Sequence, residues 1–409
     1  MSANAAPIVV VGAGQAGQQI CDSLRRGGYD GALLLLGDEH SLPYQRPPLS
    51  KKFLTGTLES ERLLLRPASF YEKLAVDVRL GTAVTAIDRT QHQLHLADGT
   101  RLTYARLALA TGTRVRPLVI GGHEIAGVHY VRSLTDGERL RQALVTAQRV
   151  AIVGGGFIGL EVAAIARELG RQVLVVEALE RLMARAVAPP VSDFYAALHR
   201  RHGVDVRLHT GVSSIISNDH GYTLVTSDGD SHRVDVLVAG IGVVPNSEIA
   251  ERAGLACRDG IVVDEQARTS DPDIVAAGDC TMHMNGFLGR ELRLESVQNA
   301  VDQAKIAAAS LLGQTVGYCQ VPWFWSDQYD VKLQIAGIGV PYDTAVVRGN
   351  IADAEFSLFY FRDGQLAGAD SINRPIDHMA CRRLLAQHTA LDPAHAGAVD
   401  FDLMALARA

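Results

Sequence analysis

Apolar residues along the chain gather into short, unbroken runs that end in glycine-rich turns. The run 8–11 precedes Gly12, and the run 150–153 precedes Gly154. Continuous runs of this length are typical of strands that are buried on both faces of a parallel sheet. A helical pattern and a second apolar run, at 32–36 and at 172–176, follow each turn. The pattern therefore predicts a strand–helix–strand unit that is built twice.

Both turns carry three glycines in the same spacing, followed by a helix. The glycines are Gly12, Gly14 and Gly17 in the first turn and Gly154, Gly156 and Gly159 in the second, with Ala16 and Ile158 before the last glycine of each. Such a turn lets the backbone approach a pyrophosphate, and the helix N-terminus offers it free N–H groups. One match is weak evidence, whereas two, each between a strand and a helix, predict two dinucleotide sites in one chain.

Acidic residues close both units where the second strand ends. Asp38 and Glu39 follow the run 32–36, and Glu177 follows the run 172–176. Both positions lie about 20 residues beyond the last glycine, where a carboxylate can hold a ribose hydroxyl. A solvated charge at a strand end is the alternative interpretation, and the complete glycine patterns favour the ribose role.

The rest of the pattern predicts small hairpins and a separate C-terminal region. Asp98-Gly99 and Asp228-Gly229 predict turns of antiparallel hairpins, and a third apolar strand at 274–277 ends at Gly278-Asp279. A long helix is expected from about 296 to 312. Beyond residue 321 we expect antiparallel strands at 332–336, 344–348 and 356–361 and a basic helix at about 377–387.

Composition narrows the class of protein further. The chain has 409 residues, of which 47% are hydrophobic, and a net charge of −6, which gives no support for a nucleic-acid partner. No apolar run has the length of a membrane span, and residues 1–7 lack a signal pattern, so we expect no membrane association and a cytoplasmic protein. The five cysteines are scattered, which predicts neither a local redox disulfide nor a metal site.

These motifs resemble the pyridine-nucleotide–disulfide oxidoreductase superfamily, of glutathione-reductase-like fold. The pieces that carry the resemblance are the two glycine turns, 47–51, 110–112, 240–242, 278–280 and 322–328. Residues 322–328 and the absence of a redox cysteine pair make the chain similar to one branch of this superfamily. This branch is the putidaredoxin-reductase-like, FAD-dependent ferredoxin reductases of bacterial oxygenase systems. The resemblance implies an α/β protein with two Rossmann-like three-layer nucleotide-binding domains and a C-terminal α+β domain. It places an FAD domain at 1–113 and 242–320, an inserted NAD domain at 114–241 and the third domain at 321–409.

The same resemblance implies a set of site residues. Those for FAD are Gly12, Gly14, Ala16, Gly17, Asp38, Glu39, Lys51, Val84, Arg132, Asp279, Val297 and Trp325. Those for NAD are Gly154, Gly156, Ile158, Gly159, Glu177 and Gly242. Lys51, Glu161 and Trp325 would act next to the flavin. Glu161 would either pair with Lys51 or cap the second helix, and the sequence favours neither.

The resemblance finally implies an activity and partners. It implies a ferredoxin–NAD(+) reductase, a flavoprotein that passes electrons from NADH through FAD, one at a time, to a [2Fe-2S] ferredoxin that feeds a cytochrome P450 or a ring-hydroxylating dioxygenase. A monomer or weak homodimer is expected. Candidate ferredoxin-docking residues are Lys305, Arg374, Arg382 and Arg383, each of which could equally be an ordinary solvated charge. A rubredoxin reductase and a redox-sensing interaction flavoprotein are the alternatives. An NADH oxidase or peroxidase that uses flavin alone is the same-fold alternative, and the members that reduce peroxide are disfavoured, because the stretch 40–44 has no cysteine.

Overall fold

The computed structural model describes residues 6–218 and 221–408, which form two compact units. The first unit holds the described residues up to 45 together with 61–114 and 244–322, and the second holds the rest. The chain passes between them at β8 (Thr113–Val115) and β18 (Val243–Pro245), which pair with each other. Residues 46–60 belong to the second unit, although the sequence placed them in the FAD domain. The division into three domains stays a prediction.

The first unit is built on a parallel five-stranded sheet between two layers. The strand order is β20-β7-β1-β2-β3, with β1 (Ile8–Val11), β2 (Leu33–Leu36), β3 (Val76–Arg79), β7 (Arg106–Leu109) and β20 (Ile274–Ala276). One face is covered by α1 (Gln15–Arg26), α2 (Ala68–Lys73) and α7 (Val297–Leu311), whose apolar side chains share a core with β1 and β2. The runs that the sequence marked as doubly buried are thus central strands.

Smaller elements cover the other face of this sheet. They are the antiparallel β4 (Val84–Asp88), β5 (Gln93–Leu96) and β6 (Arg101–Thr103), then α6 (Glu248–Arg252), β19 (Ile261–Val263), β21 (Thr281–Asn285) and β22 (Arg290–Leu292). The turn between β5 and β6 lies at Asp98-Gly99, and the positive φ of 85° at Gly99 explains its glycine. This hairpin is confirmed.

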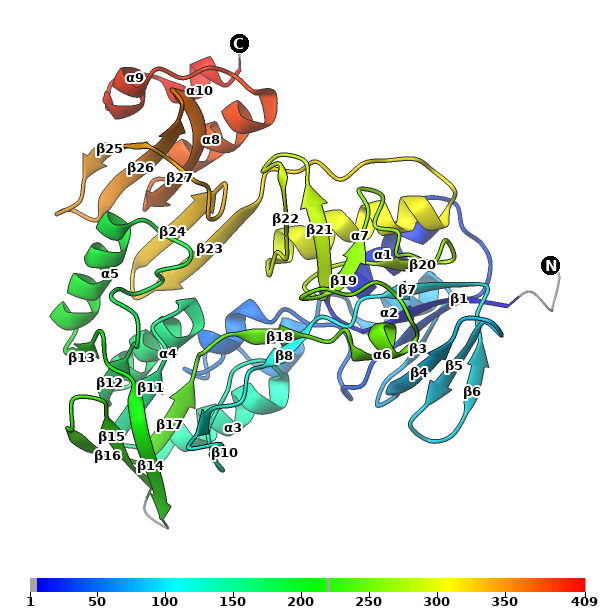
Figure 1. The fold of residues 1–409 in the computed structure, drawn as a ribbon, viewed down its shortest axis with the longest axis horizontal. Coiled ribbons are helices and arrows are strands. Elements are labelled where there is room, and N and C mark those ends of the chain that lie inside the picture. Colours follow the sequence, from blue (N-terminus) through cyan, green and yellow to red (C-terminus); the bar gives the residue numbers. More distant parts are fainter. Residues whose placement is uncertain (1–5, 219–220, 409) are drawn as a thin grey trace. The chain divides into compact units, whose positions relative to one another are not determined.

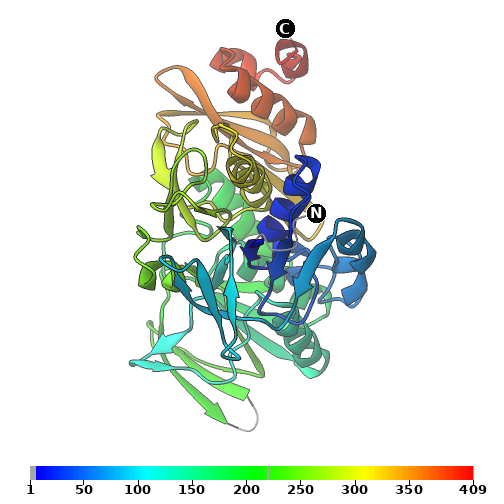
Figure 2. The same ribbon diagram turned by 90° about the vertical axis from the view of Figure 1, so that its right-hand side faces the viewer.

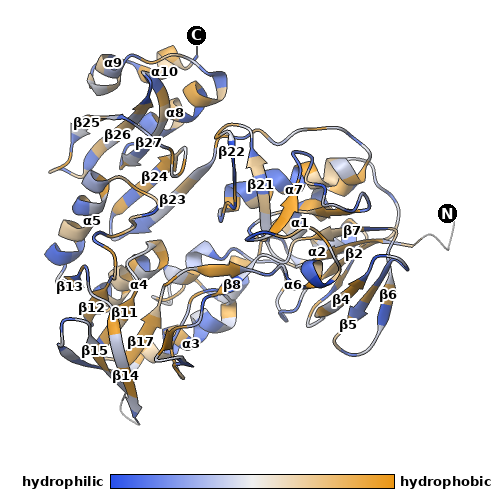
Figure 3. Cartoon of the chain, viewed as in Figure 1, coloured by the Kyte–Doolittle hydropathy of each residue, from blue (hydrophilic) through white to orange (hydrophobic). Residues whose placement is uncertain are grey.

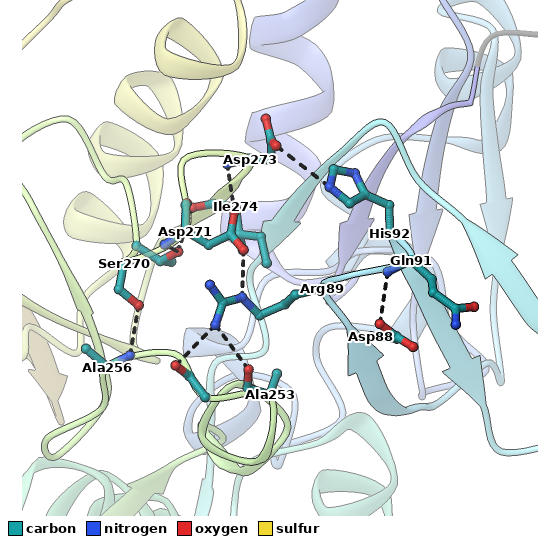
Figure 4. A network of polar contacts seen from close by, with 12 residues as sticks. Asp88, Arg89, Gln91, His92, Ala253, Ala256, Ser270, Asp271, Asp273 and Ile274 are labelled. Carbon is teal, nitrogen blue, oxygen red and sulfur yellow. Dashed lines mark hydrogen bonds and ion pairs between the residues drawn. The ribbon is translucent and has the colours of Figure 1, made fainter.

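A polar network joins the distant parts of the sequence within the first unit (Figure 4). Arg89 Nε lies 2.6 Å from Asp271 Oδ2, and the same guanidinium donates to the carbonyls of Ala253 and Gly254 at 3.3 Å. His92 lies 3.8 Å from Asp273 in the same group. The contacts hold the β4–β6 hairpins against residues 253–273, and we therefore assign Arg89 a structural role.

The second unit repeats the parallel design and adds a C-terminal sheet (Figure 1). Its first sheet has the order β13-β12-β11-β17, with β11 (Arg149–Val153), β12 (Gln172–Val176), β13 (Val204–Arg207) and β17 (Val236–Ala239). The helices are η1 (Pro47–Ser50), α3 (Leu134–Thr146), α4 (Phe157–Glu168) and α5 (Pro189–Arg201), and η2 (Ser60–Leu63) lies at the unit boundary. Hairpin strands follow at β9 (Val119–Ile120), β10 (His123–Glu124), β14 (Val212–Asn218), β15 (Gly221–Thr226) and β16 (Ser231–Val234). Figure 3 shows the hydrophobic character of β17, whose four residues are all buried.

The C-terminal region is an antiparallel sheet that carries helices on one side (Figures 1 and 2). The strand order is β23-β24-β27-β26-β25, with β23 (Trp323–Gln328), β24 (Val331–Ala336), β25 (Thr344–Asn350), β26 (Glu355–Arg362) and β27 (Gln365–Ile372). The helices are α8 (Pro375–Gln387), α9 (Pro393–Gly397) and α10 (Leu403–Leu406). The three strands expected here and the helix are confirmed, whereas β23 and β27 were not predicted. The overall α/β class with an added α+β region is confirmed.

Candidate nucleotide-binding and redox site

The first glycine turn leaves no room for larger residues at its first and third positions. Gly12 has a φ of 113°, and a Cβ there would overlap the carbonyl oxygen of Ala110. A Cβ on Gly17 would overlap the carbonyl oxygen of Gly12, so this glycine lets α1 pack tightly on β1. Gly14 differs, because no atom of the described residues other than its chain neighbours lies within 4 Å of an added Cβ. Open space at the middle glycine is what a turn that receives a phosphate requires.

The second turn repeats this geometry. Gly154 has a φ of 103°, and a Cβ would come within 2.5 Å of the Gly240 carbonyl oxygen. A Cβ on Gly159 would overlap the carbonyl oxygen of Gly154. At Gly156 the nearest atom is 3.8 Å away, which is ordinary contact, so this side of the turn is open. Ile158, on the first turn of α4, is 42% exposed.

Neither helix that leaves these turns has a side-chain cap. Gly14 and Gly156 are the N-cap residues of α1 and α4, and in neither case does a described side chain accept from the first turn. The N-terminal N–H groups and the positive end of each helix dipole therefore face the open side of the turn. The residues present thus fit the pyrophosphates of two dinucleotides.

The carboxylate of Glu177 lies against the second turn. One of its oxygens accepts from the Gly155 N–H at 2.7 Å, and the other accepts from the Leu179 N–H at 2.8 Å. These bonds fix the carboxylate beside the glycines, where a ribose would follow a bound pyrophosphate. The nearby Arg181 donates to the carbonyls of Val187 and Ala184, at 2.7 and 2.6 Å. Its guanidinium is therefore held by the backbone of its own loop.

The corresponding acidic pair in the first unit is arranged differently. Glu39 accepts from the hydroxyl of Tyr44 at 2.6 Å and is partly buried. Asp38 is exposed, and its carboxylate accepts from the N–H of Glu39 at 3.1 Å. The side chain of Glu39 is thus the better held of the two.

Lys51 and Glu161 form an ion pair in the second unit. The Lys51 ammonium lies 2.7 Å from Glu161 Oε2 and also donates to the Pro47 carbonyl at 3.2 Å. The two side chains are only 16% and 4% exposed, so water screens the pair weakly. The lysine is fixed because it follows the rigid η1 turn, which begins with two prolines. Of the two roles considered for Glu161, pairing with Lys51 is the one that the structure contains.

Two serines complete the surroundings of Glu161. Ser50 Oγ donates to the same oxygen as Lys51, and Ser326 Oγ donates to the other oxygen, Oε1, at 2.6 Å. Sequence reasoning missed both serines. Their only signals were the position of Ser50 next to Lys51 and the alternation along β23. In a strand every second residue shares a face, which groups Ser326 with Phe324 and Gln328 and sets Trp325 on the opposite face.

Ring contacts support this description of β23. Phe324 packs on Phe157 of α4 with 4.7 Å between ring centroids. Trp325 and Trp323, on the opposite face, lie 5.5 Å apart and are both partly buried. Arg382 lies over the Trp323 ring at 4.5 Å.

The remaining predicted site residues are distributed over both units. Asp279 follows β20 and accepts from Thr113 Oγ1 at 3.4 Å, and Val297 is the first residue of α7. Val84 begins β4, at an irregularity in its pairing with β5. In the second unit the Arg132 carbonyl accepts from Arg46 at 2.5 Å, and the Gly242 carbonyl accepts from the Arg116 N–H at 3.0 Å. These contacts place the residues but do not test their roles.

The four candidate docking residues have different surroundings. Lys305 lies in the first unit and pairs with Asp302 at 2.9 Å, whereas the three arginines lie on α8 or at its start. Arg374 pairs with Asp377 at 2.6 Å, Arg382 stacks on Trp323, and Arg383 is exposed.

Three of the five cysteines are buried, Cys257 is half-buried and Cys319 is exposed. All five cysteines are free thiols, and burial raises the pKa of the Cys21 thiol to about 12 and that of Cys280 above its usual value. Among residues 6–218 and 221–408, no group of histidine, cysteine and carboxylate side chains is arranged to hold a metal ion. No helix in these residues is both long and apolar enough to cross a membrane.

Comparison with known proteins places the chain among flavin-dependent reductases. Residues 6–304 match the family described as pyridine nucleotide-disulphide oxidoreductase, and residues 323–407 match the one described as reductase C-terminal. Rhodocoxin reductase of Rhodococcus erythropolis is 46% identical over 98% of this chain and 94% of its own. The ferredoxin reductase for the CYP199A2 system of Rhodopseudomonas palustris superposes with a TM-score of 0.95, at 41% identity over 98% of this chain and 100% of its own.

A second solved structure extends the similarity to a complex. The covalent putidaredoxin reductase–putidaredoxin complex matches with a TM-score of 0.94, at 38% identity and 98% coverage of both chains. The match of the first family model covers well over half of the described chain, and it includes both glycine turns and the Lys51–Glu161 pair. The resemblance inferred from the sequence is confirmed: the chain belongs to the pyridine nucleotide-disulphide oxidoreductase family.

Proposed function

We propose that this protein is an NADH-dependent ferredoxin reductase that uses FAD and serves an oxygenase. The observation that carries the proposal is the presence of two glycine turns of the same geometry, one in each unit, in a chain without a cysteine pair. Two dinucleotides in one chain suit electron transfer from one to the other. The names of similar proteins, among them a ferredoxin reductase for the CYP199A2 system and the ferredoxin–NAD(+) reductase component of an anthranilate 1,2-dioxygenase system, support the same activity.

The first unit would bind FAD and the second NADH. In the first, Gly12, Gly14, Ala16 and Gly17 would receive the FAD pyrophosphate, and Glu39, with Asp38 beside it, would hold the adenosine ribose. Asp279 would bind the ribityl chain, Val297 and Val84 would offer backbone groups, and Arg132 would lie on the FAD side. In the second, Gly154, Gly156, Ile158 and Gly159 would receive the NADH pyrophosphate, with Gly242 at the adjoining strand end.

NADH is preferred over NADPH in this proposal. Glu177 would accept hydrogen bonds from the ribose hydroxyls, and a 2′-phosphate in their place would meet its negative charge. Arg181 offers little compensation, because its guanidinium already donates to two carbonyls of its own loop.

Bound FAD supplies the exchange between a two-electron donor and a one-electron acceptor. Lys51 contributes a positive charge held by a rigid turn, and Glu161 balances this charge while NADH is absent. Negative charge that develops near the ammonium during reduction would be stabilised by it. Trp325 would lie on the side where the ferredoxin docks.

The acceptor is proposed to be a small acidic [2Fe-2S] ferredoxin. Because the whole chain is acidic, attraction requires a local basic surface, for which Arg382 and Arg383 on α8, Arg374 at its start and Lys305 are the candidates. We propose a monomer or weak homodimer, an FAD domain interrupted by an NAD domain, and a location in the cytoplasm, where five free thiols are stable.

Reconstituted turnover tests the function. The purified protein should carry one FAD, oxidise NADH and reduce a [2Fe-2S] ferredoxin, with a rate that falls as salt rises. Arg383→Glu should slow ferredoxin reduction while NADH-to-ferricyanide turnover persists, since a small acceptor needs no docking. Arg201→Glu, the same charge change at an exposed position of α5, is the matched control. Turnover with a rubredoxin but with no ferredoxin would replace this proposal with a rubredoxin reductase, and absence of flavin would refute both.

A further inference from the structure

A line of buried polar side chains runs through the second unit from the Lys51–Glu161 pair to α5. Ser326 donates to Glu161 Oε1 at 2.6 Å, and Gln328 Nε2 donates to Ser326 Oγ at 3.2 Å. His199 Nε2 lies 2.8 Å from Gln328 Oε1, and its Nδ1 lies 3.2 Å from the Tyr329 hydroxyl. Ser326, Gln328 and His199 are at most 1% exposed, so water does not replace these contacts.

The direction of every hydrogen bond in this line follows from one charge. An ionised Glu161 can only accept, so Ser326 must give it its single proton. Ser326 then accepts from its neighbour, which must be the Nε2 amide group of Gln328. The Oε1 of Gln328 therefore faces His199, whose Nε2 must carry a proton.

The direction of the hydrogen bond at the other end of the line, between His199 and Tyr329, follows in the same way. A neutral imidazole that is protonated at Nε2 has a lone pair at Nδ1, which accepts from the Tyr329 hydroxyl. Burial lowers the pKa of His199 to about 4, so the ring is neutral near pH 7. Tyr329 in turn stacks on His202, with 3.7 Å between ring centroids. All donors in the line thus point toward Glu161.

We propose that Ser326, Gln328 and His199 are positioning residues that orient the carboxylate of Glu161 and, through it, the ammonium of Lys51. The inference rests on the proposed function, in which Lys51 stabilises charge during reduction by NADH. A continuous buried line is suited to this task, because each member is held at both ends and none can turn without leaving a polar atom unpaired. It explains why β23 carries polar residues at two successive inward positions.

Rapid mixing with NADH separates positioning from binding. Ser326→Ala and His199→Phe should lower the limiting rate of flavin reduction roughly 10-fold, as expected for losing hydrogen bonds that support a charged group, with little change in the Kd for NADH. His199→Gln keeps an amide donor toward Gln328 and should recover most of the rate. Ser357→Ala is the control, because it removes buried hydrogen bonds to Ser371 and Asp377 in the same unit but lies outside the line.

A second measurement does not depend on turnover. Imidazole ¹⁵N NMR at pH 7, with the His199 signals assigned from their loss in His199→Gln, should show Nε2 protonated and Nδ1 unprotonated. A proton on Nδ1 would overturn the direction of the line. A wild-type reduction rate in Ser326→Ala would overturn the positioning role even if His199→Phe does not fold. Failure of NADH to reduce the wild-type flavin would instead refute the proposed function.

Discussion

The second glycine turn allows fold and cofactor binding to be tested separately by adding one methyl group at a time. Gly156 has φ −81° and ψ 176°, which alanine adopts without strain, and a Cβ there meets only ordinary contact at 3.8 Å. Gly159 is three residues away, but its Cβ would overlap the Gly154 carbonyl oxygen and lie 3.2 Å from an Ile152 methyl group. Gly156→Ala should therefore spare the fold, and Gly159→Ala should damage it.

The magnitudes follow from these contacts. In Gly159→Ala the new methyl group is forced between α4 and the turn. This overpacking should lower the free energy of unfolding by about 1–3 kcal/mol. At Gly156 alanine is a poorer N-cap than glycine, which destabilises the folded state. Alanine also restricts the unfolded chain, which stabilises the protein by about 0.4–1 kcal/mol, so the two effects nearly offset each other. A pyrophosphate that must retreat from the new methyl group should lose contacts worth roughly 1–2 kcal/mol, a 5- to 30-fold weaker Kd for NADH.

The assay combines rapid mixing with thermal unfolding followed by far-UV circular dichroism. Gly156→Ala should keep its FAD and its unfolding temperature, raise the Kd for NADH and leave the limiting rate of flavin reduction nearly unchanged. Gly159→Ala should unfold at a lower temperature. Gly211→Ala in the same unit, where no atom lies within 4 Å of the added Cβ, is the control that should alter neither property.

Two outcomes would refute this reasoning. An unchanged Kd for NADH in Gly156→Ala would show that the nucleotide backbone does not approach this turn. Wild-type unfolding of Gly159→Ala would show that α4 and the turn are not in the close contact seen in the structure.

Three further predictions concern charge. Lys51→Met should lower the limiting rate of flavin reduction more than the affinity for NADH, as measured by rapid mixing, and an unchanged rate would make Lys51 structural. The specificity constant should favour NADH over NADPH in the wild type, and Glu177→Gln should narrow the ratio; equal constants in the wild type would refute the role of Glu177. Burial lowers the pKa of His199, His283 and His378 from 6.5 to about 4, so their contribution to stability is complete above pH 6.5 and is lost as pH falls toward 4. The unfolding temperature should therefore fall more in the wild type than in His378→Phe as pH is lowered from 6.5 toward 4, because the variant lacks one of these histidines, and parallel curves would contradict the assignment.

The sequence predicts the parallel sheets well because their signals are local. Strands 8–11 and 172–176 were placed at their observed bounds, since each is a continuous apolar run closed by glycine or a charge. β23 was missed because its pattern does not alternate simply. Phe324 and Trp325 are both large and aromatic although they belong to opposite faces, and Ser326 and Gln328 are polar although they are buried. β27 was missed because its buried end contains Gly368, Asp370 and Ser371, which are poor strand formers.

The site residues differ in the same way in how well the sequence predicts them. The glycines are identifiable from the sequence because the three glycines of each turn are close together in the chain and form one local structure. The partners of Glu161 are not, because Ser50 and Ser326 lie 111 and 165 positions away and are joined to it only by packing. The assignment of residues 46–60 to the second unit has the same origin, since this segment contacts α3 and α4 rather than its neighbours in sequence.

The two faces of β23 connect these observations. One face carries Ser326 and Gln328 toward Glu161, and the other carries Trp325, proposed to lie on the ferredoxin side. Because Trp325 and Ser326 are consecutive residues of one strand, a displacement of the β23 backbone that moves Trp325 also moves Ser326, on the opposite face. If an acceptor that docks near Trp325 displaces β23, the same displacement should move the Ser326 hydroxyl that donates to Glu161. If so, ferredoxin binding should change the rate of flavin reduction by NADH in the wild type and change it less in Ser326→Ala.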